Sequence, residues 1–507
     1  MGVIRTIGVI GAGTMGRGIA ELAARNGFSV TVHDAADNAA AHAIGTVRDG
    51  LGRDISKGRM TRTEAEVVVG RLASDNLAAA VAADLVIEAA LEDIKVKRSL
   101  FREISRLASP EAILTTNTSS LSIAAIAEGV SDPSRFAGLH FFNPPTRVRA
   151  VEIVRGPATA AATTETLRWF AGALGQRPFV VGDTPGFLVN HIGRAFTGES
   201  LRILDEGIAS ATEIDRIVRD ALHFRMGPFE LLDLVGLDIS AAVAEQVWRA
   251  FGGEPRFRPA PIVAERVGRG LLGRKSGSGF YEYDSRGRPL SDGEPDLHGV
   301  PQPVRLVGFD ASSARRVAGL FPPDMVTMDP TAIALVGPIG GSAATEAGRL
   351  GLDPARTVAI DTIFTDRVTL AGAPDIAAAV AAGVRAAGHP VSVVADGPGL
   401  PAQRIATMMV LVAAEAAAAG IGTPEDIDVA ARLALAYPRG PFELCDAVGA
   451  ETIAAMAAGL FALTGDRRWR PSAWLDRHAQ TGVEWRNLSQ SRNLRQIDSS
   501  QSEAQNS

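Results

Sequence analysis

The sequence predicts an α/β fold in four parts: a parallel sheet wound with helices, an all-α domain, a reduced α/β segment and a second all-α domain. Three observations indicate this order. Short apolar segments alternate with helical ones before Asp183, the pattern is helical from there to about residue 271, and motifs of this helical part return later. At 507 residues the chain is also too long for one core, so several domains are expected.

The first α/β segment begins with a short buried strand that is followed by a helix from about Met15 to Asn26. The strands expected in this segment are 4–10, 28–33, 84–88, 112–116 and two more within 138–154. Helical segments lie between them, including a long one from about 37 to 57. Strands that alternate with helices are typical of a parallel sheet covered on both faces.

An internal repeat links the two helical parts. Asp183-Thr-Pro-Gly-Phe matches Asp396-Gly-Pro-Gly-Leu, and Gly227-Pro-Phe-Glu-Leu matches Gly440-Pro-Phe-Glu-Leu, in both cases 213 residues later. Phe257-Arg-Pro similarly matches Trp469-Arg-Pro at a spacing of 212. Three motifs in nearly one register predict that one helical domain occurs twice.

A glycine loop lies between the first expected strand and helix. Its residues are Gly11, Ala12, Gly13, Thr14, Met15 and Gly16, the pattern GxGxxG of a Rossmann-type dinucleotide site. The glycines let the backbone approach a pyrophosphate, and the helix N-terminus offers it N–H groups. Asp34 ends the second strand, where a carboxylate binds ribose hydroxyls and repels a 2′-phosphate. We therefore expect NAD; FAD, which uses the same fingerprint, and an ordinary glycine turn are the alternatives.

His140 lies in the run Gly138-Leu-His-Phe-Phe-Asn-Pro-Pro, near the predicted end of a strand. Open α/β sheets bind their ligands at such ends. A neutral imidazole is suited to take a proton from a secondary alcohol while a hydride leaves the same carbon. Glu152, on the next expected strand, could orient the ring. A lone histidine is more often a hydrogen-bonded core residue, so position alone does not decide its role.

Three long motifs occur in one order: Thr116-Asn-Thr-Ser-Ser, Arg135-Phe-Ala-Gly-Leu-His-Phe-Phe-Asn-Pro and Asp183-Thr-Pro-Gly-Phe-Leu-Val-Asn. They closely resemble the L-3-hydroxyacyl-CoA dehydrogenase family, over about residues 4–284, and the repeat extends the resemblance to 396–480. The resemblance implies NAD-dependent oxidation of the 3-hydroxyl of an L-3-hydroxyacyl-CoA thioester. It places the catalytic set on Ser119, His140, Glu152 and Asn190, with Ser119 also contacting substrate.

The resemblance implies further contacts. Glu92, Lys97, Asn143 and Lys275 match positions near NAD, and Lys57 matches a position near the CoA moiety. Each assignment has a plainer structural alternative: a helix cap for Ser119, a strand-edge carboxylate for Glu152, a helix-surface residue for Asn190 and solvated surface for the lysines. Arg147 and Arg149 follow the histidine motif and are interpreted as surface residues.

The second half lacks the features of the first site. Gln403 stands where Asn190 would be, no second GLHFFNP precedes it, and Gly337-Pro-Ile-Gly-Gly has the wrong spacing for a dinucleotide loop. We expect it not to catalyse but to pack on the first helical copy as an internal pseudo-partner, with a homo-oligomer also open. This layout resembles long bacterial family members, namely 3-hydroxyadipyl-CoA dehydrogenases of phenylacetate degradation and long 3-hydroxybutyryl-CoA dehydrogenases.

These observations predict six segments along the chain. They are 1–183 (NAD-binding Rossmann domain), 184–284 (helical domain), 285–302 (Pro-, Gly- and charge-rich linker), 303–395 (reduced Rossmann-like domain), 396–484 (second helical domain) and 485–507 (disordered polar tail).

Two other functions remain open at this point: a sugar-acid oxidoreductase resembling L-gulonate 3-dehydrogenase, and a non-catalytic NAD-binding protein. The formal net charge of −6 gives no electrostatic reason to expect nucleic acid or an anionic membrane as partner. The lone Cys445 cannot form an intrachain disulfide. The N-terminus does not resemble a signal peptide and no run of about 18 apolar residues occurs. We therefore expect a cytoplasmic protein without a membrane span or metal site.

Overall fold

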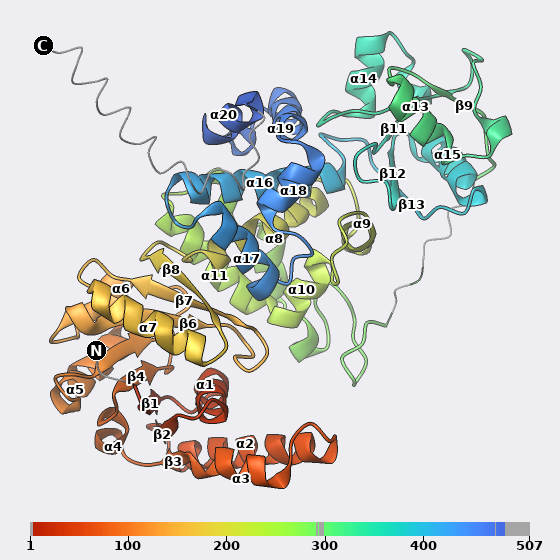
Figure 1. Ribbon diagram of the computed structural model, residues 1–507. Coiled ribbons are helices and arrows are strands. Elements are labelled where there is room, and N and C mark those ends of the chain that lie inside the picture. Colours follow the sequence, from red (N-terminus) through yellow and green to blue (C-terminus); the bar gives the residue numbers. More distant parts are fainter. Residues whose placement is uncertain (1–3, 291–292, 294–298, 472, 482–507) are drawn as a thin grey trace, which may run out of the picture. The chain divides into compact units, whose positions relative to one another are not determined.

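The computed structural model describes residues 4–290, 293, 299–471 and 473–481 (Figure 1). The chain divides into two compact units, 1–190 with 433–435 and 191–432 with 436–507, and each is described by itself. The expected linker 285–302 lies partly outside the described residues, and the expected tail 485–507 lies wholly outside them.

The first unit is built on an eight-stranded sheet in the order β3-β2-β1-β4-β5-β6-β7-β8. Its strands are β1 (Thr6–Ile10), β2 (Ser29–His33), β3 (Leu72–Ser74), β4 (Leu85–Glu88), β5 (Ile113–Thr116), β6 (Phe136–Phe141), β7 (Ala150–Arg155) and β8 (Arg177–Gly182). The helices are α1 (Thr14–Arg25), α2 (Ala39–Ser56), α3 (Arg62–Gly70), α4 (Leu77–Val81), α5 (Ile94–Leu107), α6 (Ile123–Ala127) and α7 (Ala161–Ala173), with a 3-10 turn η1 (Pro133–Arg135). The strand order reverses between β1 and β4, so a ligand crevice is expected at the carboxyl ends of these strands.

Local sequence explains why these elements form. The residues of β4 and β5 are all buried, as in a sheet covered on both faces. Asp93 caps α5 by accepting hydrogen bonds from the backbone N–H groups of Lys95 and Val96 at 2.8 and 3.0 Å. Thr61 and Glu64 form a capping box at the start of α3. The polar caps fix the helix starts, and the apolar faces of α1, α2, α3 and α7 form a core with the sheet.

The sheet departs from the prediction in one place. Strands β6 and β7 are antiparallel, whereas a wholly parallel sheet was expected. Only eight residues, 142–149, connect them, which is too short for the crossover that a parallel pair requires. The sequence analysis also missed the short β3 and the edge strand β8.

Helix α8 (Val189–Asp205) begins at the end of the first unit, and the first helical copy continues in the second unit. Its further helices are α9 (Ala211–Ala221), α10 (Pro228–Val235), α11 (Leu237–Ala250) and α12 (Pro261–Gly268), with 3-10 turns η2 (Pro255–Phe257) and η3 (Arg274–Ser276). Buried Asp215 on α9 caps α10 by accepting hydrogen bonds from the N–H groups of Phe229 and Glu230.

The second copy repeats this detail. Its helices are α16 (Pro401–Ala418), α17 (Pro424–Ala434), α18 (Pro441–Val448), α19 (Ala450–Thr464) and α20 (Ala473–Thr481), with the 3-10 turn η6 (Arg467–Trp469). Asp428 on α17 accepts hydrogen bonds from the N–H groups of Phe442 and Glu443 on α18, as Asp215 does on α10. The predicted duplication of the helical domain is confirmed.

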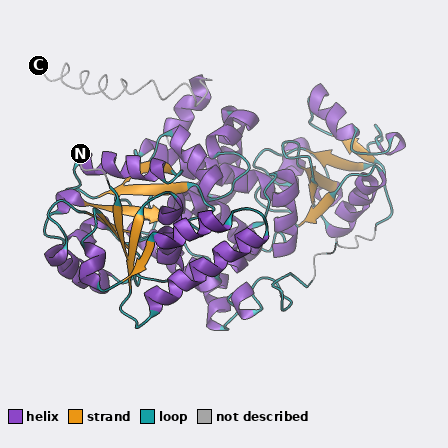
Figure 2. Ribbon diagram, turned by 60° about the horizontal axis from the view of Figure 1, so that its bottom comes forward, coloured by secondary structure: helices purple, strands orange, loops and turns teal. Residues whose placement is uncertain are grey.

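Between the two copies in the sequence, the chain forms a five-stranded sheet in the order β13-β12-β11-β10-β9, drawn in orange in Figure 2 as all strands are. Its strands are β9 (Val304–Leu306), β10 (Ile333–Val336), β11 (Thr357–Ile360), β12 (Val368–Ala371) and β13 (Val391–Val394). The accompanying helices are α13 (Ala311–Ala318), α14 (Ala343–Leu350) and α15 (Pro374–Ala386), with the 3-10 turns η4 (Pro323–Met325) and η5 (Pro354–Arg356). Strands β11 and β12 are antiparallel, as β6 and β7 are.

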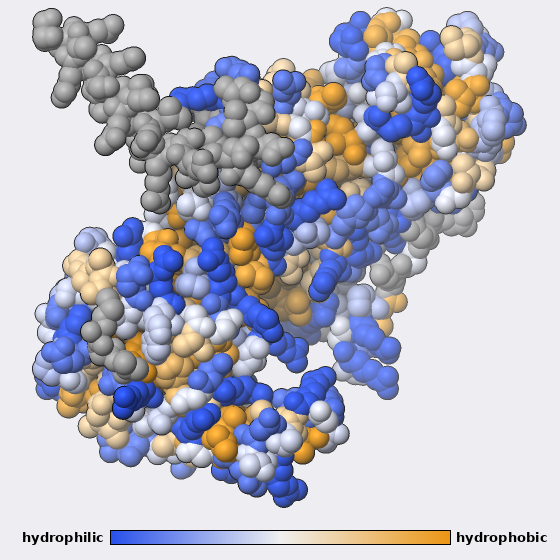
Figure 3. Space-filling model, viewed as in Figure 1, coloured by the Kyte–Doolittle hydropathy of each residue, from blue (hydrophilic) through white to orange (hydrophobic). Residues whose placement is uncertain are grey.

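On the face drawn in Figure 3, hydrophobic and hydrophilic residues are interspersed across the described residues. Among those residues, no single helix has the length and apolar composition needed to cross a membrane. The pair Pro441–Val448 and Ala450–Thr464 meets that criterion only when its two helices, bent by 96°, are taken together.

Candidate active site

The glycine loop lies where the sequence predicts it, between β1 and α1. Gly13 is the N-cap of α1 and has no side chain to occupy the first-turn N–H groups. A Cβ at Gly13 would meet no protein atom within 4 Å, whereas one at Gly16 would collide with the carbonyl oxygen of Gly11. Gly11 itself has a φ of +109°, which favours glycine. The loop therefore offers free N–H donors and open space to a phosphate group, which fits NAD.

Asp34 follows β2 and is held beside this loop. Its Oδ2 accepts a hydrogen bond from the backbone N–H of Ala12 at 2.7 Å, and its Oδ1 accepts one from Ala36 at 2.9 Å. Each carboxylate oxygen can accept a second bond, so both keep the capacity to bind a ribose hydroxyl.

His140 and Glu152 face each other across the antiparallel pair β6–β7, in direct register. The His140 Nδ1 lies 2.7 Å from Glu152 Oε2, and both side chains are buried, at 6% and 0% exposure. The other carboxylate oxygen accepts hydrogen bonds from the backbone N–H groups of Leu188 and Val189, each at 2.9 Å. Three donors thus fix this carboxylate. Since a carboxylate only accepts, a neutral His140 carries its proton on Nδ1 and presents an unprotonated Nε2.

Ser119 and Asn190 lie together. The Nδ2 of Asn190 donates to the backbone oxygen of Ser119 at 3.0 Å. The N–H of Ser119 donates to Glu92 Oε1 at 3.0 Å, and its hydroxyl lies 3.4 Å from the same oxygen. Ser119 does not cap a helix, because Ser122 is the N-cap of α6. Asn190 is half-buried and bonded, so it is not a free helix-surface residue.

Lys97 is buried, at 1% exposure, and not solvated as an isolated surface lysine would be. Its Nζ lies 2.6 Å from Glu88 Oε1 and 3.3 Å from Glu92 Oε2. Glu88 Oε2 in turn accepts a hydrogen bond from the Thr116 hydroxyl at 2.6 Å. This network ties the carboxyl ends of β4 and β5 to the loop that carries Ser119.

Two residues at these strand ends were not singled out from the sequence. Glu88 ends the buried run Leu85-Val-Ile-Glu, and a carboxylate at the end of a buried strand next to the glycine loop is a usable signal. Asn117 lies within a quoted motif, and its Oδ1 accepts a hydrogen bond from the backbone N–H of Phe141 at 2.8 Å. It thereby ties the residue after His140 to the loop after β5.

The remaining candidates lie outside these hydrogen-bonded groups. Asn143 is exposed after β6, and its peptide bond to Pro144 is cis. Lys57 is exposed at the C-cap of α2. Lys275 belongs to the second unit, where its Nζ lies 2.5 Å from Asp238 Oδ1. Arg147 and Arg149 are exposed, as expected of surface arginines.

The second α/β segment carries different residues at the matching positions. Asp396 accepts hydrogen bonds from the N–H groups at the start of α14, as Asp183 does at the start of α6. Continuing the β11–β12 register by one residue puts Asp361 opposite Thr369, where β6–β7 has His140 opposite Glu152.

Gln403 fills the place of Asn190 in this segment. Its amide binds Gly340 N, Pro338 O and Asp361 Oδ1 at 2.9, 3.1 and 3.2 Å. Both Gln403 and Asp361 are fully buried. The amide is therefore engaged in internal bonds.

Comparison with known proteins identifies the family to which the chain belongs. The family model for the NAD-binding domain of 3-hydroxyacyl-CoA dehydrogenase matches residues 6–184, and the model for its C-terminal domain matches 186–283 and again 399–489. The chain is 36% identical over 494 residues to 3-hydroxyadipyl-CoA dehydrogenase of Escherichia coli K12, covering 95% of this chain and 99% of that protein. It is also 36% identical over 289 residues to the human mitochondrial hydroxyacyl-coenzyme A dehydrogenase, covering 55% of this chain and 92% of the human protein.

A solved structure extends the likeness to the fold. The crystal structure of 3-hydroxybutyryl-CoA dehydrogenase from Escherichia coli K12 superposes with a TM-score of 0.83 at 35% identity, covering 95% of this chain and 99% of that one. The likeness therefore includes the five-stranded sheet and the second helical copy. This chain belongs to the 3-hydroxyacyl-CoA dehydrogenase family and is an NAD-dependent oxidoreductase.

Proposed function

We propose that this enzyme oxidises the 3-hydroxyl of an L-3-hydroxyacyl-CoA to a 3-oxo group, with His140 as the general base. The observation that carries the proposal is the buried His140–Glu152 pair, whose 2.7 Å contact involves Nδ1 and leaves Nε2 available. No described residue hydrogen-bonds Nε2. A base placed in this way can accept the hydroxyl proton of a bound substrate.

Glu152 acts through His140. By accepting the Nδ1 proton it fixes the useful tautomer, and its negative charge stabilises the imidazolium that forms when Nε2 takes the proton. The two backbone N–H groups on its other oxygen hold the carboxylate in place. Glu152 is thus a positioning residue in this proposal, and His140 is the group that meets the substrate.

Ser119 and Asn190 position the substrate. Both offer polar groups at one edge of the sheet, and the bond between Asn190 Nδ2 and the Ser119 carbonyl sets their spacing. Hydrogen bonds from these side chains to substrate oxygens would hold C3 in the geometry that the transfer needs. When bound at the glycine loop, NAD supplies the acceptor for the hydride that leaves C3. Asp34 would bind its ribose, and Glu92, Lys97 and Asn143 of the same unit would lie toward the cofactor.

The substrate we propose is 3-hydroxyadipyl-CoA, with 3-hydroxybutyryl-CoA as the second candidate, since the long relatives carry these two names. Lys57 offers a cation to the CoA phosphates. The second α/β segment holds no second active site in this proposal, because Asp361 and Gln403 are fully buried and bonded to each other. The second helical copy is an internal partner of the first.

One assay tests the proposal: NADH formation from L-3-hydroxyadipyl-CoA, L-3-hydroxybutyryl-CoA and L-gulonate, with the His140→Ala variant beside the natural enzyme. We expect NADH from the thioesters, none from L-gulonate, and a large loss of kcat in the variant. Absence of NADH with both thioesters would contradict the proposed reaction. A His140→Ala variant with undiminished kcat would contradict the role of the base.

A further inference from the structure

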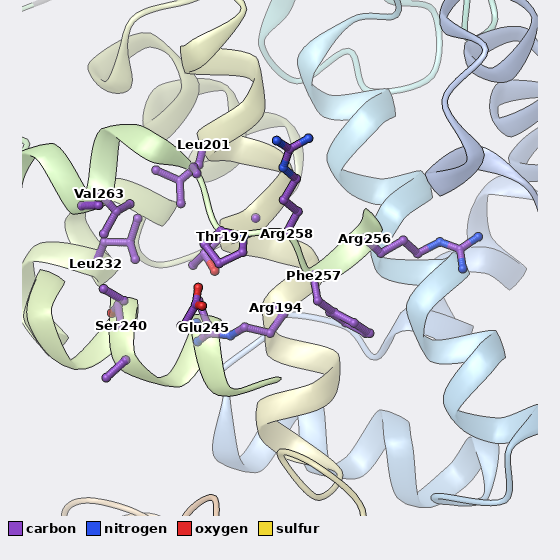
Figure 4. Close-up of a pocket in the computed structure, with 17 residues that line it drawn as sticks. Arg194, Thr197, Leu201, Leu232, Ser240, Glu245, Arg256, Phe257, Arg258 and Val263 are labelled. Carbon is purple, nitrogen blue, oxygen red and sulfur yellow. The ribbon is translucent and has the colours of Figure 1, made fainter. Parts of the chain in front are cut away.

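A cavity of about 360 Å³ lies within the first helical copy, inside the second unit. Residues of α8, α10, α11 and α12 and of the segment 256–260 line it. Its walls are largely apolar, with Leu201, Leu232, Phe257 and Val263 among them (Figure 4). The volume lies within the range of small-molecule sites, roughly 300–1,000 Å³. The cavity can therefore accept a short aliphatic chain.

Arg194 brings a positive charge into this apolar space. The side chain extends from α8 across the cavity toward Ser240 and Glu245 (Figure 4). Within the described part of the chain it forms no ion pair, and its buried Nε has no hydrogen-bond acceptor. The titratable group that acts on it is the phenol of Tyr437, which is neutral because burial raises its pKa.

A buried guanidinium without a counter-ion destabilises the folded protein unless a ligand pairs with it. Burial lowers the pKa of Arg194, yet a guanidinium keeps its charge in proteins. Charges taken out of water are normally paired. The carboxylate of Glu245 also lines the cavity, but its Oε1 accepts a hydrogen bond from Arg249 at 2.6 Å. An unpaired cation among apolar walls indicates a ligand that is aliphatic and ends in an anion.

Helix α8 sets the distance from the reacting end. Arg194 follows Asn190 by four residues on this helix, so both side chains leave the same face in successive turns, about 6 Å apart along the axis. In a six-carbon acyl chain that ends in a carboxylate, three bonds of about 1.5 Å join C3 to the terminal carboxyl carbon. Arg194 is one helical turn along α8 from the residue that the proposed function puts at the reacting end.

We propose that Arg194 binds the terminal carboxylate of a dicarboxylic acyl chain and so selects dicarboxylic over monocarboxylic 3-hydroxyacyl-CoA substrates. The inference rests on the proposed function, which assigns the reaction and puts Asn190 at the reacting end. A guanidinium pairs with a carboxylate through two parallel N–H···O bonds, which gives both energy and direction.

The test compares kcat/KM for L-3-hydroxyadipyl-CoA and L-3-hydroxyhexanoyl-CoA, which have equal chain length and differ in the terminal group. We expect the natural enzyme to prefer the dicarboxylic thioester. Arg194→Leu should lower this preference about 10- to 100-fold, the effect of removing a charge-assisted hydrogen bond. Arg194→Lys should keep part of it. Because hexanoyl turnover also requires folded enzyme, the ratio separates specificity from misfolding.

Three further variants sharpen the result. Arg269→Leu removes an exposed arginine on the same helical copy that does not line the cavity, and should leave the ratio unchanged. Arg258→Leu removes an exposed arginine that does line it, so a larger loss here than at Arg194 would overturn the assignment. If Glu245→Gln lowers the preference as much as Arg194→Leu does, Arg194 acts as the counter-ion of Glu245 and not of the substrate carboxylate. That result would also overturn the assignment.

Failure of this inference is distinguishable from failure of the proposed function. Turnover of both thioesters without a preference in the natural enzyme, or a preference that survives in Arg194→Leu, contradicts the inference and leaves the reaction intact. If neither thioester yields NADH, the proposed function fails and the inference fails with it.

Discussion

Replacing Glu152 by glutamine changes one atom of a side chain whose every contact is known. The carboxylate meets three donors: the Nδ1–H of His140 at 2.7 Å and the backbone N–H groups of Leu188 and Val189 at 2.9 Å. A glutamine amide has one acceptor oxygen and one NH₂ group, so it cannot satisfy all three. If its oxygen turns to His140, the NH₂ group faces two buried donors, at a cost of about 1–3 kcal/mol for each unsatisfied group.

The opposite orientation is therefore favoured, with the oxygen on the two backbone donors and the NH₂ group on Nδ1. His140 must then accept at Nδ1 and carry its proton on Nε2, which removes the lone pair that the base needs. We expect kcat to fall about 10³- to 10⁴-fold, as in triads where an amide replaces the orienting carboxylate. The fold should survive, because the variant stays isosteric.

The assay is NADH formation at saturating substrate, beside His140→Ala. Glu165→Gln serves as the matched control, because Glu165 is an exposed glutamate on α7 whose nearest partner is Arg168 at 3.8 Å. It should retain full activity. A Glu152→Gln variant within tenfold of the natural kcat would refute the tautomer argument.

Other consequences follow from residues already described. Asp34→Ala removes the acceptor beside the glycine loop and should raise the KM for NAD about 10- to 100-fold, the effect of losing one hydrogen bond to a charged group; an unchanged KM would contradict its role on the ribose. Arg404 of the second copy lies 2.5 Å from the buried carboxylate of Glu199 in the first, and Arg404→Leu leaves Glu199, among the described residues, only the contacts at 3.5 Å with Arg202 and Arg468. The variant should lower the free energy of unfolding by about 1.5–3 kcal/mol in urea titrations, the range for losing a hydrogen bond to a charged group; a loss under 1 kcal/mol would show that this ion pair does not hold the copies together. Burial raises the pKa of Asp215 and of Asp428 to about 7, so the native state holds protons that the unfolded state has lost between pH 4 and 7. The stability they contribute is complete below pH 4 and is lost as pH rises through 7; Asp428→Asn should flatten this slope in melts at pH 5 and 8, and an unaltered slope would count against it.

Much of the fold follows from local signals. Short-range patterns predict the glycine loop, the strand ending at Asp34 and the helix after it. The repeat of Gly227-Pro-Phe-Glu in Gly440-Pro-Phe-Glu predicts the duplicated helices. The three-residue β3 carries too short a pattern to stand out. The antiparallel course of β7 depends on the length of its connection, which apolar periodicity does not report.

Part of the candidate site could likewise be predicted from the sequence, and part could not. Ser119, His140, Glu152 and Asn190 could be picked from motifs, and the structure gives each a bonded partner. The ion pair between Lys97 and Glu88 could not be predicted from the sequence. A lysine on an amphipathic helix is normally expected to face solvent, and only the fold shows that a strand lies beside it. The lone charge of Arg194 could not be seen either, since the absence of a partner is a property of three dimensions.

Gln403 has a consequence for how many ligands the chain holds. In a pair of identical subunits every position must serve catalysis in both copies, so neither can lose its amide contact to substrate. Here the two helical copies share one polypeptide, and the second commits its amide to Gly340, Pro338 and Asp361. Covalent linkage thus allows the two copies to take different roles: the second copy can lose its catalytic residues and serve only in packing, while the first keeps them. Titration should accordingly give one NAD per chain, half the number that its count of helical domains suggests.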